Sequence, residues 1–488
     1  MTYIQVNNLN FTYDNATYKV FDNVSFAFDT NYKLGLIGRN GKGKTTFLKL
    51  LNNELDDGGA IINKPITSYF PYNIIDETLD VSSLIYTLEP DVEYWKFLKE
   101  FHLLELEDNL LERAYNTLSG GEKTKVQLAL LFSFDTHYLL IDEPTNHLDL
   151  KGRYKLAEYL KKKDGFLLVS HDRSFLDETI DHVLSFDKNK IELVSGNFSS
   201  WFKDRENIEN LEKMRNTKLK KDISKLESSV RKNVNWSNAV EKSKIGAGDK
   251  GYVGHMAAKA MKRAKNIERR QQKAIEERKT LLKNVEEMDD LKIHPLIYFK
   301  DTLVNFHDFS IRYDDILFKP IRLTINQNDK VFINGDNGSG KSSMIKAVID
   351  NNVPYVGELL IGSRLKISYI PQDSSFLKGR LDDYIEKANV NGDLMRSILR
   401  KLDFKRELFR EDMCNFSLGQ KKKVLIAKSL SEEAHLYIWD EPLNYIDVFS
   451  RIMIEKLISN YNVTILIIEH DKAFKDSIAS KTIDLIEC

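Results

Sequence analysis

The sequence has little of what marks secreted, membrane-spanning or uniformly charged proteins. Its two cysteines, Cys414 and Cys488, are too few for a disulfide framework and fit a reducing compartment. No apolar run approaches the about 18 residues that a membrane-spanning helix needs. The first residues, MTYIQVNNLNF, lack the basic patch and apolar core of a secretory signal, so we expect a cytoplasmic protein. The net charge is −1 although 30% of residues are charged, which argues against a uniformly basic or acidic partner surface.

The chain of 488 residues is too long for one compact core, and its motifs repeat. The stretches GRNGKGKT at 38–45 and GDNGSGKS at 335–342 share one glycine-rich pattern, and their lysines, Lys44 and Lys341, are 297 positions apart. Four further pairs keep an offset of 298 to 300: Tyr13 and Tyr313, Ser119 and Ser417, Glu143 and Glu441, and His171 and His470. A chance match does not hold its register through five elements, so the sequence predicts a duplicated α/β domain.

A segment of different composition separates the two copies. It is rich in Lys, Glu, Arg and Gln, which favour helix, and it has no proline before Pro295. Apolar residues recur at heptad-like spacing: Leu219, Ile223, Leu226 and Val230, then Ile275, Leu282 and Val285. Glycines gather at 246–254, where the chain should turn. We expect a first copy at 1–203, an antiparallel helical hairpin at 204–292 with its tip at about 236–261, and a second copy at 293–488.

The glycine-rich motifs are typical of P-loops. Glycines let backbone N–H groups close around phosphates, and the lysine adds a fixed positive charge. Thr45 and Ser342 then offer hydroxyls to Mg²⁺. The predicted nucleotide-binding residues of these loops are Gly38, Asn40, Gly41, Gly43, Lys44, Thr45 and Thr46, and Gly335, Asn337, Gly338, Gly340, Lys341, Ser342 and Ser343.

Paired acids end an apolar strand in each copy, at Asp142-Glu143 and at Asp440-Glu441. In such a pair the aspartate orients the metal's water shell, and the glutamate polarises the attacking water. Both pairs precede a proline at the end of a predicted buried strand, which disfavours a role as simple helix caps. We predict Glu143 and Glu441 as catalytic residues and Asp142 and Asp440 as metal ligands.

The sequence Leu118-Ser119-Gly120-Gly121-Glu122 matches the signature of the ABC ATPases, and both copies resemble that family throughout. The resemblance implies ATP and Mg²⁺ as cofactors and a catalytic role for the switch histidines, His171 and His470. It implies that Tyr13 and Tyr313 stack on adenine, and that Gln372 ligates Mg²⁺. Each nucleotide is then held between one copy's P-loop and the other copy's signature. The predicted signature contacts are Ser119, Gly120 and Gly121 for the Lys341 site, and Ser417, Gly419 and Gln420 for the Lys44 site.

Two positions depart from the family pattern. The second signature has Leu418 where the first has Gly120, and Tyr72 stands where the second copy has Gln372. A tyrosine hydroxyl does not ligate Mg²⁺ as an amide oxygen does. Both departures belong to the Lys44 site, so we hypothesise that this site hydrolyses ATP more slowly than the Lys341 site.

Fused cassettes joined by a charged hairpin resemble the ABC-F family of translation factors. Residues 211–280 contain 20 Lys and Arg but 8 Asp and Glu, and such a concentration of positive charge is typical of a nucleic-acid partner. The alternative reading is a solvated coiled coil. The tip mixes basic groups with rings, which suits structured RNA. The candidate ribosome contacts are Trp236, Lys244, Ile245, Tyr252 and His255.

Within ABC-F the chain most resembles the group that protects ribosomes from lincosamides, pleuromutilins and streptogramin A compounds. The Trp439–Asn444 stretch, the altered second signature and the glycine-broken tip carry this resemblance. It implies a monomer with intramolecular cassette pairing that binds the tRNA exit site of the 70S ribosome, near 23S rRNA and P-site tRNA, without membrane or DNA. Two alternatives stay open: a housekeeping ABC-F factor acting on stalled ribosomes, and the ATPase subunit of a transporter.

Overall fold

The computed structural model describes residues 3–14, 19–146, 148–186, 191–242, 291–313, 315–336, 338–350 and 353–486. It also describes residues 259, 262, 265–267, 269–273 and 275–276 of the linker. The chain divides into two compact units, one formed by Met1–Ser199 with Asp289–Cys488 and the other by Ser200–Met288. Both copies thus belong to the first unit, and the linker forms the second. The linker unit begins and ends four residues before the predicted limits of 204 and 292.

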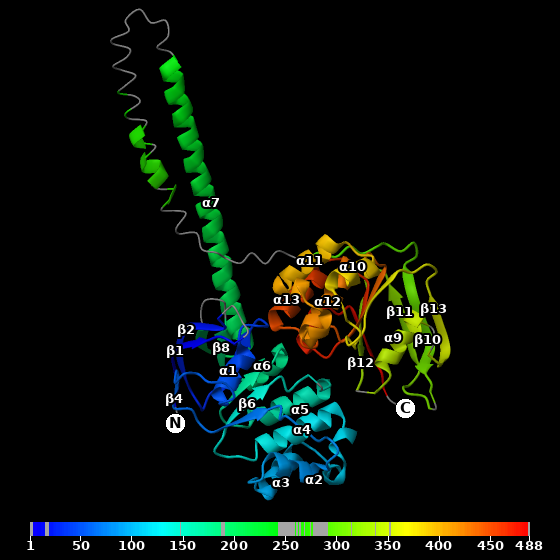
Figure 1. The fold of residues 1–488 in the computed structure, drawn as a ribbon. Coiled ribbons are helices and arrows are strands. Elements are labelled where there is room, and N and C mark those ends of the chain that lie inside the picture. Colours follow the sequence, from blue (N-terminus) through cyan, green and yellow to red (C-terminus); the bar gives the residue numbers. More distant parts are fainter. Residues whose placement is uncertain are drawn as a thin grey trace, which may run out of the picture. The chain divides into compact units, whose positions relative to one another are not determined.

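The first copy contains an antiparallel sheet and a larger, mostly parallel one (Figure 1). The antiparallel sheet has the order β2 (Phe21–Asp29), β1 (Tyr3–Phe11), β4 (Ile61–Ile62). The larger sheet has the order β5 (Thr67–Phe70), β6 (Tyr138–Asp142), β7 (Phe166–Val169), β3 (Lys33–Gly38), β8 (His182–Phe186), β9 (Ile191–Ser195). The helices are α1 (Lys44–Leu51), α2 (Val81–Leu88), α3 (Tyr94–Leu103), α4 (Gly120–Leu131), α5 (Leu150–Lys161) and α6 (Arg173–Thr179).

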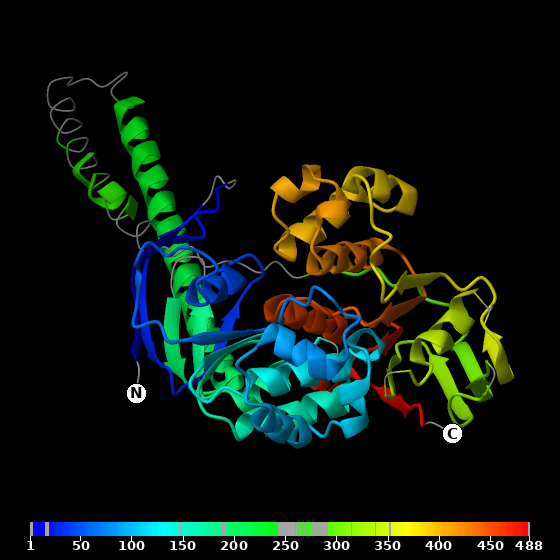
Figure 2. The same ribbon diagram turned by 60° about the horizontal axis from the view of Figure 1, so that its bottom comes forward.

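The second copy repeats this plan, which confirms the predicted duplication. Its antiparallel sheet has the order β11 (Ile321–Asn326), β10 (Thr302–Ile311), β13 (Tyr355–Ile361). Its parallel sheet has the order β14 (Ile367–Ile370), β15 (Leu436–Asp440), β16 (Ile465–Ile468), β12 (Lys330–Asn334), β17 (Lys481–Asp484). The helices are α9 (Lys341–Asp350), α10 (Leu381–Ala388), α11 (Gly392–Lys401), α12 (Leu418–Ser431), α13 (Val448–Asn460) and α14 (Lys472–Ile478). In Figure 2 the copies are the blue-to-teal and light-green-to-red parts of the first unit.

The parallel sheets determine where the functional residues meet. Strands β7 and β16 are buried along their whole length, and their sequences FLLV and ILII are continuous apolar runs, as expected for strands covered on both faces. In such a sheet the loops that follow neighbouring strands lie at one edge, which is the usual place for a ligand. Strands β3, β6 and β7 therefore bring the P-loop, the acid pair and His171 to the same edge.

One long helix, α7 (Phe198–Lys242), begins two residues before the linker unit and forms its outgoing arm. Its 45 residues correspond to a length of about 68 Å. The described residues between 259 and 276 are helical as well. Ile223 on the outgoing helix and Ile275 on the returning one are buried, which agrees with the predicted seam of an antiparallel hairpin. Among the described residues, no helix has both the length and the apolar character needed to cross a bilayer.

Candidate functional site

Each P-loop lies between a strand and the helix that begins with its lysine. Gly43 precedes α1 with a φ of 92°, and a Cβ at this position would lie 2.7 Å from Val20 Cγ1, so only glycine fits the turn. Lys44 Nζ donates to the backbone oxygens of Gly38 at 2.7 Å and Arg39 at 3.3 Å. The turn and the buried lysine make a concave backbone loop that suits a phosphate.

The second P-loop has the same geometry. Gly340 precedes α9 with a φ of 90°, and Lys341 Nζ donates to the backbone oxygens of Gly335 and Asp336, each at 2.7 Å. Of the residues predicted for this loop, Asn337 lies outside the described residues. The two loops therefore offer the same chemistry to a ligand.

The aspartates at the strand ends lie beside the P-loop hydroxyls. Asp142 Oδ2 accepts from Thr45 Oγ1 at 3.2 Å and from the Tyr69 hydroxyl at 3.0 Å. Burial raises the pKa of Asp142. Burial also raises the pKa of Asp440 to about 6, although the hydrogen bond from Ser342 lowers it. Asp440 Oδ1 is a buried oxygen without a hydrogen-bond partner among the described residues. A carboxylate beside a hydroxyl and an unsatisfied oxygen is a donor set that fits Mg²⁺.

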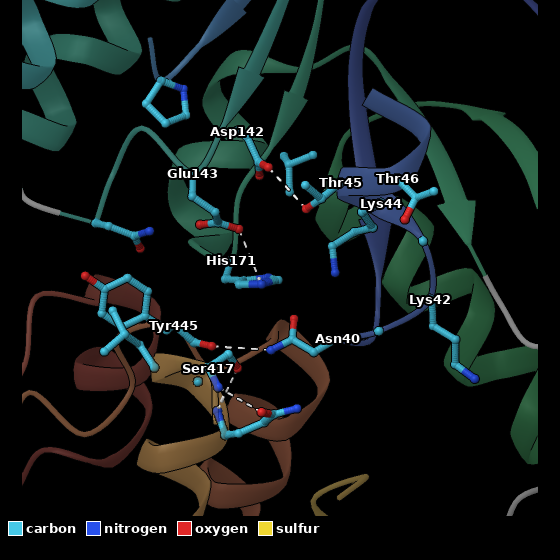
Figure 3. Close-up of a pocket in the computed structure, with 18 of the residues that line it drawn as sticks. Asn40, Lys42, Lys44, Thr45, Thr46, Asp142, Glu143, His171, Ser417 and Tyr445 are labelled. Atoms are coloured by element: carbon cyan, nitrogen blue, oxygen red, sulfur yellow. Dashed lines mark hydrogen bonds and ion pairs between the residues drawn. The ribbon is translucent and has the colours of Figure 1, made fainter. Parts of the chain in front are cut away.

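The glutamates next to these aspartates have different surroundings in the two copies. Glu143 Oε1 lies 3.3 Å from His171 Nε2 (Figure 3). Glu441 lies farther from His470, at 3.9 Å, and its Oε2 accepts from Gln372 Nε2 at 2.9 Å and from Asn444 Nδ2 at 2.7 Å. Both glutamates have a positive φ, 53° and 48°, a strained conformation that a non-glycine residue adopts only when its surroundings impose it.

The histidines are held in their neutral form. Burial lowers the pKa of His171, and the neighbouring charge of Lys44 lowers it further. Burial also lowers the pKa of His470 to about 3, with the charge of Lys341 acting in the same direction. A neutral imidazole can both accept and donate a hydrogen bond, which suits a group that orients a phosphate or a water.

Each cavity is lined by residues from both copies. The larger one, of about 1910 Å³, is lined by Lys44, Glu143 and His171 of the first copy and by Ser417 and Gly419 of the second. Across the boundary, Asn40 Nδ2 donates to the backbone oxygen of Tyr445 at 3.3 Å (Figure 3). Both departures from the family pattern, Tyr72 and Leu418, line this cavity.

The second cavity, of about 820 Å³, has the reciprocal composition. Lys341, Glu441 and His470 line it from the second copy, and Gly120 and Arg153 from the first. Tyr313 lines it too, and its hydroxyl lies 3.1 Å from Ser343 Oγ. Neither cavity could therefore bind a ligand in the same way if one copy were absent.

Capping boxes fix the N-termini of the two signature helices. Glu122 N donates to Ser119 Oγ at 3.2 Å, and Ser119 N donates to Glu122 Oε2 at 2.7 Å. Ser417 and Gln420 form the same box on α12. The serine oxygen is an acceptor in these boxes, so its hydroxyl hydrogen stays available to a bound anion. Gly419 lies against the second copy's own chain, since a Cβ there would be 2.5 Å from the Tyr445 oxygen.

The remaining predicted residues divide into two groups. Tyr13 lies beside the first P-loop, with its hydroxyl 3.0 Å from Thr46 Oγ1 and 41% of the residue exposed. Four candidates for ribosome contact, Lys244, Ile245, Tyr252 and His255, lie outside the described residues. Trp236 lies on α7, but its side chain is outside the described part as well.

Several residues that the structure places at the sites were not predicted from the sequence. Asn444 holds Glu441, and the duplication contained the signal, because Asn146 stands 298 positions earlier. Arg153 and Arg451 repeat at the same offset and are buried near the histidine loops. The contact of Tyr69 with Asp142 had no such signal, because it depends on the pairing of β5 with β6.

Glu441 accepts hydrogen bonds from Gln372 and Asn444, and this difference from Glu143 predicts unequal rates of ATP hydrolysis at the two sites. With Glu143→Gln the chain keeps only the Lys341 site, and with Glu441→Gln it keeps only the Lys44 site. We expect single-turnover ATP hydrolysis to be about 10-fold slower in Glu441→Gln, since partners that orient a catalytic or metal-binding group contribute factors of this size. Adding Gln372→Tyr to the Glu143→Gln chain should lower its hydrolysis rate toward that of the Glu441→Gln chain. Equal rates in the two single variants would contradict this asymmetry.

The partly buried Glu143 also predicts a pH dependence of stability. Burial raises the pKa of Glu143 from 4.5 to about 8, with the Asp142 charge adding to the effect. The folded chain then holds a proton that the unfolded chain releases, so stability falls as the pH rises through this window. Without nucleotide and Mg²⁺, Glu143→Gln should therefore gain in Tm over the parent from about pH 6 to about pH 9. A Tm difference that stays constant over this range would exclude a raised pKa of Glu143.

Comparison with known proteins agrees with this geometry. A family model described as "ABC transporter" matches residues 21–146 and 318–444. The ATP-binding protein Uup of Buchnera aphidicola is 29% identical over 99% of this chain and 80% of its own length. The ribosome protection protein VmlR of Bacillus subtilis is 28% identical over 95% of this chain and 84% of its own. The solved structure of archaeal aABCE1 with the ribosomal stalk protein aP1 has a TM-score of 0.63 at 18% identity, covering 98% of this chain and 87% of that one, which shows the shared fold.

Proposed function

The chain belongs to the ABC transporter family and is an ATPase that uses Mg²⁺, and we propose that it is an ABC-F protein that protects the ribosome from antibiotics. In this proposal it binds the tRNA exit site of the 70S ribosome and shields the peptidyl-transferase centre from lincosamides, pleuromutilins and streptogramin A compounds. Its partners are 23S rRNA and P-site tRNA, and it works in the cytoplasm as a monomer, without DNA or a membrane. Similarity to relatives that include ABC transporter F family member 5 of Arabidopsis thaliana, 24% identical over 99% of this chain and 75% of that protein, supports the ABC-F assignment.

The observation that carries this proposal is the charge of the hairpin. Residues 211–280 have 20 basic and 8 acidic side chains, although the whole chain has a net charge of −1. Nine of the 20 basic side chains and four of the 8 acidic ones lie on α7, a continuous helix of 45 residues. An elongated, positively charged element suits the phosphate backbone of RNA better than it suits a protein subunit in a membrane.

The chemistry of the cavities supplies the energy for this action. Lys44 and Lys341 bind the phosphates, and each signature helix directs its N-terminal N–H groups at the phosphates held by the other copy. Five residues would hold Mg²⁺: Thr45, Asp142, Ser342, Gln372 and Asp440. The ion, when bound, neutralises phosphate charge.

Glu143 and Glu441 then accept a proton from the attacking water, and His171 and His470 orient the γ-phosphate. Because each cavity needs both copies, ATP favours the paired form of the cassettes. We propose that this paired form binds the ribosome and that hydrolysis releases it. The division into 1–203, 204–292 and 293–488 assigns ATP to the copies and RNA to the hairpin tip, with Trp236, Lys244, Ile245, Tyr252 and His255 as candidate contacts.

The alternative within translation is a housekeeping factor. The name of VmlR, a ribosome protection protein, supports the protective function. The relatives named Uup and YheS, at 25 to 29% identity, are about as similar, and their names state ATP binding without ribosome protection, so the alternative stays open. The two functions share the cassettes and differ only in what the hairpin tip does.

Drug susceptibility of a sensitive bacterial host tests the proposal. Expression of the chain should raise the inhibitory concentrations of a lincosamide, a pleuromutilin and a streptogramin A compound, and leave that of an aminoglycoside unchanged. The Glu143→Gln/Glu441→Gln variant should give no protection. Unchanged susceptibility to all of these drugs, with ribosome binding retained, would favour the housekeeping factor. Co-sedimentation of the variant with membranes and not with ribosomes would favour a transporter subunit.

A further inference from the structure

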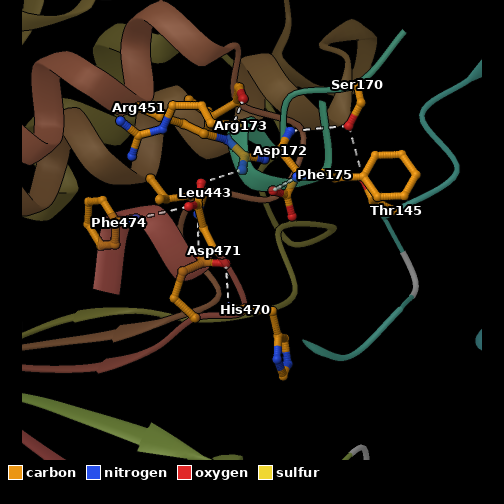
Figure 4. Close-up of polar contacts among 12 residues, drawn as sticks. Thr145, Ser170, Asp172, Arg173, Phe175, Leu443, Arg451, His470, Asp471 and Phe474 are labelled. Atoms are coloured by element: carbon orange, nitrogen blue, oxygen red, sulfur yellow. Dashed lines mark hydrogen bonds and ion pairs between the residues drawn. The ribbon is translucent and has the colours of Figure 1, made fainter. Parts of the chain in front are cut away.

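Two buried ion pairs repeat in the histidine loops of the two copies. Arg153 Nη1 donates to Asp172 Oδ2 at 2.9 Å, and Arg451 Nη1 donates to Asp471 Oδ2 at 3.0 Å. All four side chains are at most 7% exposed. Figure 4 shows Arg451 and Asp471 near Asp172 from the other copy. These pairs are matched in position and geometry, so they give the two sites the same framework.

The residue before each histidine breaks this symmetry. It is Ser170 in the first copy and Glu469 in the second. Ser170 Oγ lies 3.3 Å from Thr145 Oγ1, a contact confined to two hydroxyls, and it accepts from Asp172 N at 3.1 Å. Glu469 is only 4% exposed. The residue of the second copy that corresponds to Thr145 is Leu443, whose side chain has no hydroxyl. A buried carboxyl group thus replaces a neutral hydroxyl at one site only.

The carboxyl group of Glu469 joins the two catalytic loops of the second copy. Its Oε1 accepts from His470 N at 2.8 Å, and its Oε2 accepts from Leu443 N at 3.1 Å. Leu443 follows Glu441 by two residues and precedes Asn444, which holds the Glu441 carboxylate. One side chain therefore fixes the backbone of the acid loop against the backbone of the histidine loop.

Arg153 of the first copy contacts the histidine loop of the second copy. Its Nη1 lies 3.4 Å from the backbone oxygen of His470, across the boundary between the copies. Burial raises the pKa of Glu469, and the charges of Arg451 and Arg153 oppose that rise. Both arginines are thus close enough to be attracted by this carboxyl group, one from each copy.

We propose that Glu469 is a positioning residue for ATP hydrolysis at the Lys341 site, holding Glu441 and His470 at their working separation with the help of Arg153 from the first copy. Pairing of the cassettes would then affect the position of His470 through its contact with Arg153. At the Lys44 site the neutral contact between Ser170 and Thr145 joins the two loops in place of a carboxyl group. This inference rests on the ATPase activity alone and is independent of ribosome binding.

Single-turnover hydrolysis in the Glu143→Gln chain isolates the Lys341 site and tests the inference. Glu469→Ser installs the first copy's residue, and it should lower the maximal rate by about 10- to 100-fold, the size expected when catalytic groups are misplaced by an ångström or less. The ATP concentration at half-maximal rate should change by less than about threefold, because the phosphate-binding residues are untouched. Glu469→Gln should lie between, since its amide offers one acceptor to two N–H donors.

Two comparisons separate positioning from general destabilisation. Glu432→Gln removes another carboxylate of the second copy, one that accepts from Ser368 and pairs with Lys428, and it should leave the rate unchanged. Glu469→Ser should also be non-additive with Arg153→Lys, because both act on the same loop. The inference is wrong if Glu469→Ser keeps the parental maximal rate or changes only the ATP concentration at half-maximal rate. It is also wrong if the effects of Glu469→Ser and Arg153→Lys on the maximal rate are additive. A variant with a lowered Tm and an unchanged rate would assign Glu469 a structural role only.

Discussion

Replacing Glu143 and Glu441 together by glutamine is expected to lower ATP hydrolysis by at least about 100-fold, because a positioned general base contributes factors of this order. Each glutamate follows the aspartate at the end of a buried strand and lines a cavity with a P-loop lysine. Glutamine has nearly the same shape but accepts no proton from water. ATP binding should persist, so the variant should hold ATP between the cassettes.

Phosphate release and the retention of labelled ATP measure the two parts of this prediction. Glu432→Gln serves as the matched control, because it is the same chemical change at a residue that lines neither cavity. A double variant that hydrolyses ATP at more than one tenth of the parental rate would assign the proton transfer to other groups. Loss of ATP binding would show that these glutamates act in binding.

Neutralising the hairpin is expected to have the second large effect, on ribosome affinity. Lys213, Lys218, Lys221 and Lys225 are exposed on α7, and glutamine has a helix propensity close to that of lysine. Replacing all four by glutamine should therefore keep the helix and remove its charge. If each lysine meets a phosphate, the slope of log K against log salt should fall by up to about 3, and affinity at moderate salt should fall by about 10-fold or more.

Sedimentation with 70S ribosomes over a series of salt concentrations measures both quantities, in the Glu143→Gln/Glu441→Gln background with ATP. The control carries the same number of lysine-to-glutamine changes at exposed positions of the first unit, namely Lys162, Lys319, Lys346 and Lys387. It should keep the parental slope. Equal losses in the two variants would indicate that net charge matters, and not the hairpin.

The duplication made most of the candidate site predictable from sequence. Residues at a constant offset, such as Glu143 and Glu441, must occupy equivalent places if the copies share a fold, and parallel strands bring the ends of β3, β6 and β7 to one edge. The helix of the hairpin was predictable for a different reason. Its composition and heptad-like spacing indicated a helical hairpin over 204–292, and α7 begins at Phe198, six residues before that limit.

Other features depend on tertiary contacts that no local pattern encodes. The hydroxyl of Tyr69 reaches Asp142 only because β5 pairs with β6 in a particular register. The difference between Ser170 and Glu469 is visible in the sequence. Its meaning is not visible there, because the carboxyl group of Glu469 accepts from Leu443 N, 26 positions earlier in the chain, while Arg153 of the other copy donates to the backbone oxygen of the neighbouring His470. The predicted exchange of signatures between the sites came from family resemblance and stays a prediction. Gly120 lines the Lys341 cavity, but Ser119 and Gly121 are not among its lining residues, and Gly120 also lines the Lys44 cavity.

Ribosome binding with and without the hairpin tests the central claim most directly. The Glu143→Gln/Glu441→Gln chain should sediment with 70S ribosomes in the presence of ATP and stay in the supernatant without it. The same chain with residues 211–280 replaced by a short glycine-serine linker should bind ATP equally well and fail to sediment with ribosomes. If the shortened chain sedimented with ribosomes as the full chain does, the hairpin would not be the ribosome-binding element, and the proposed function would be wrong.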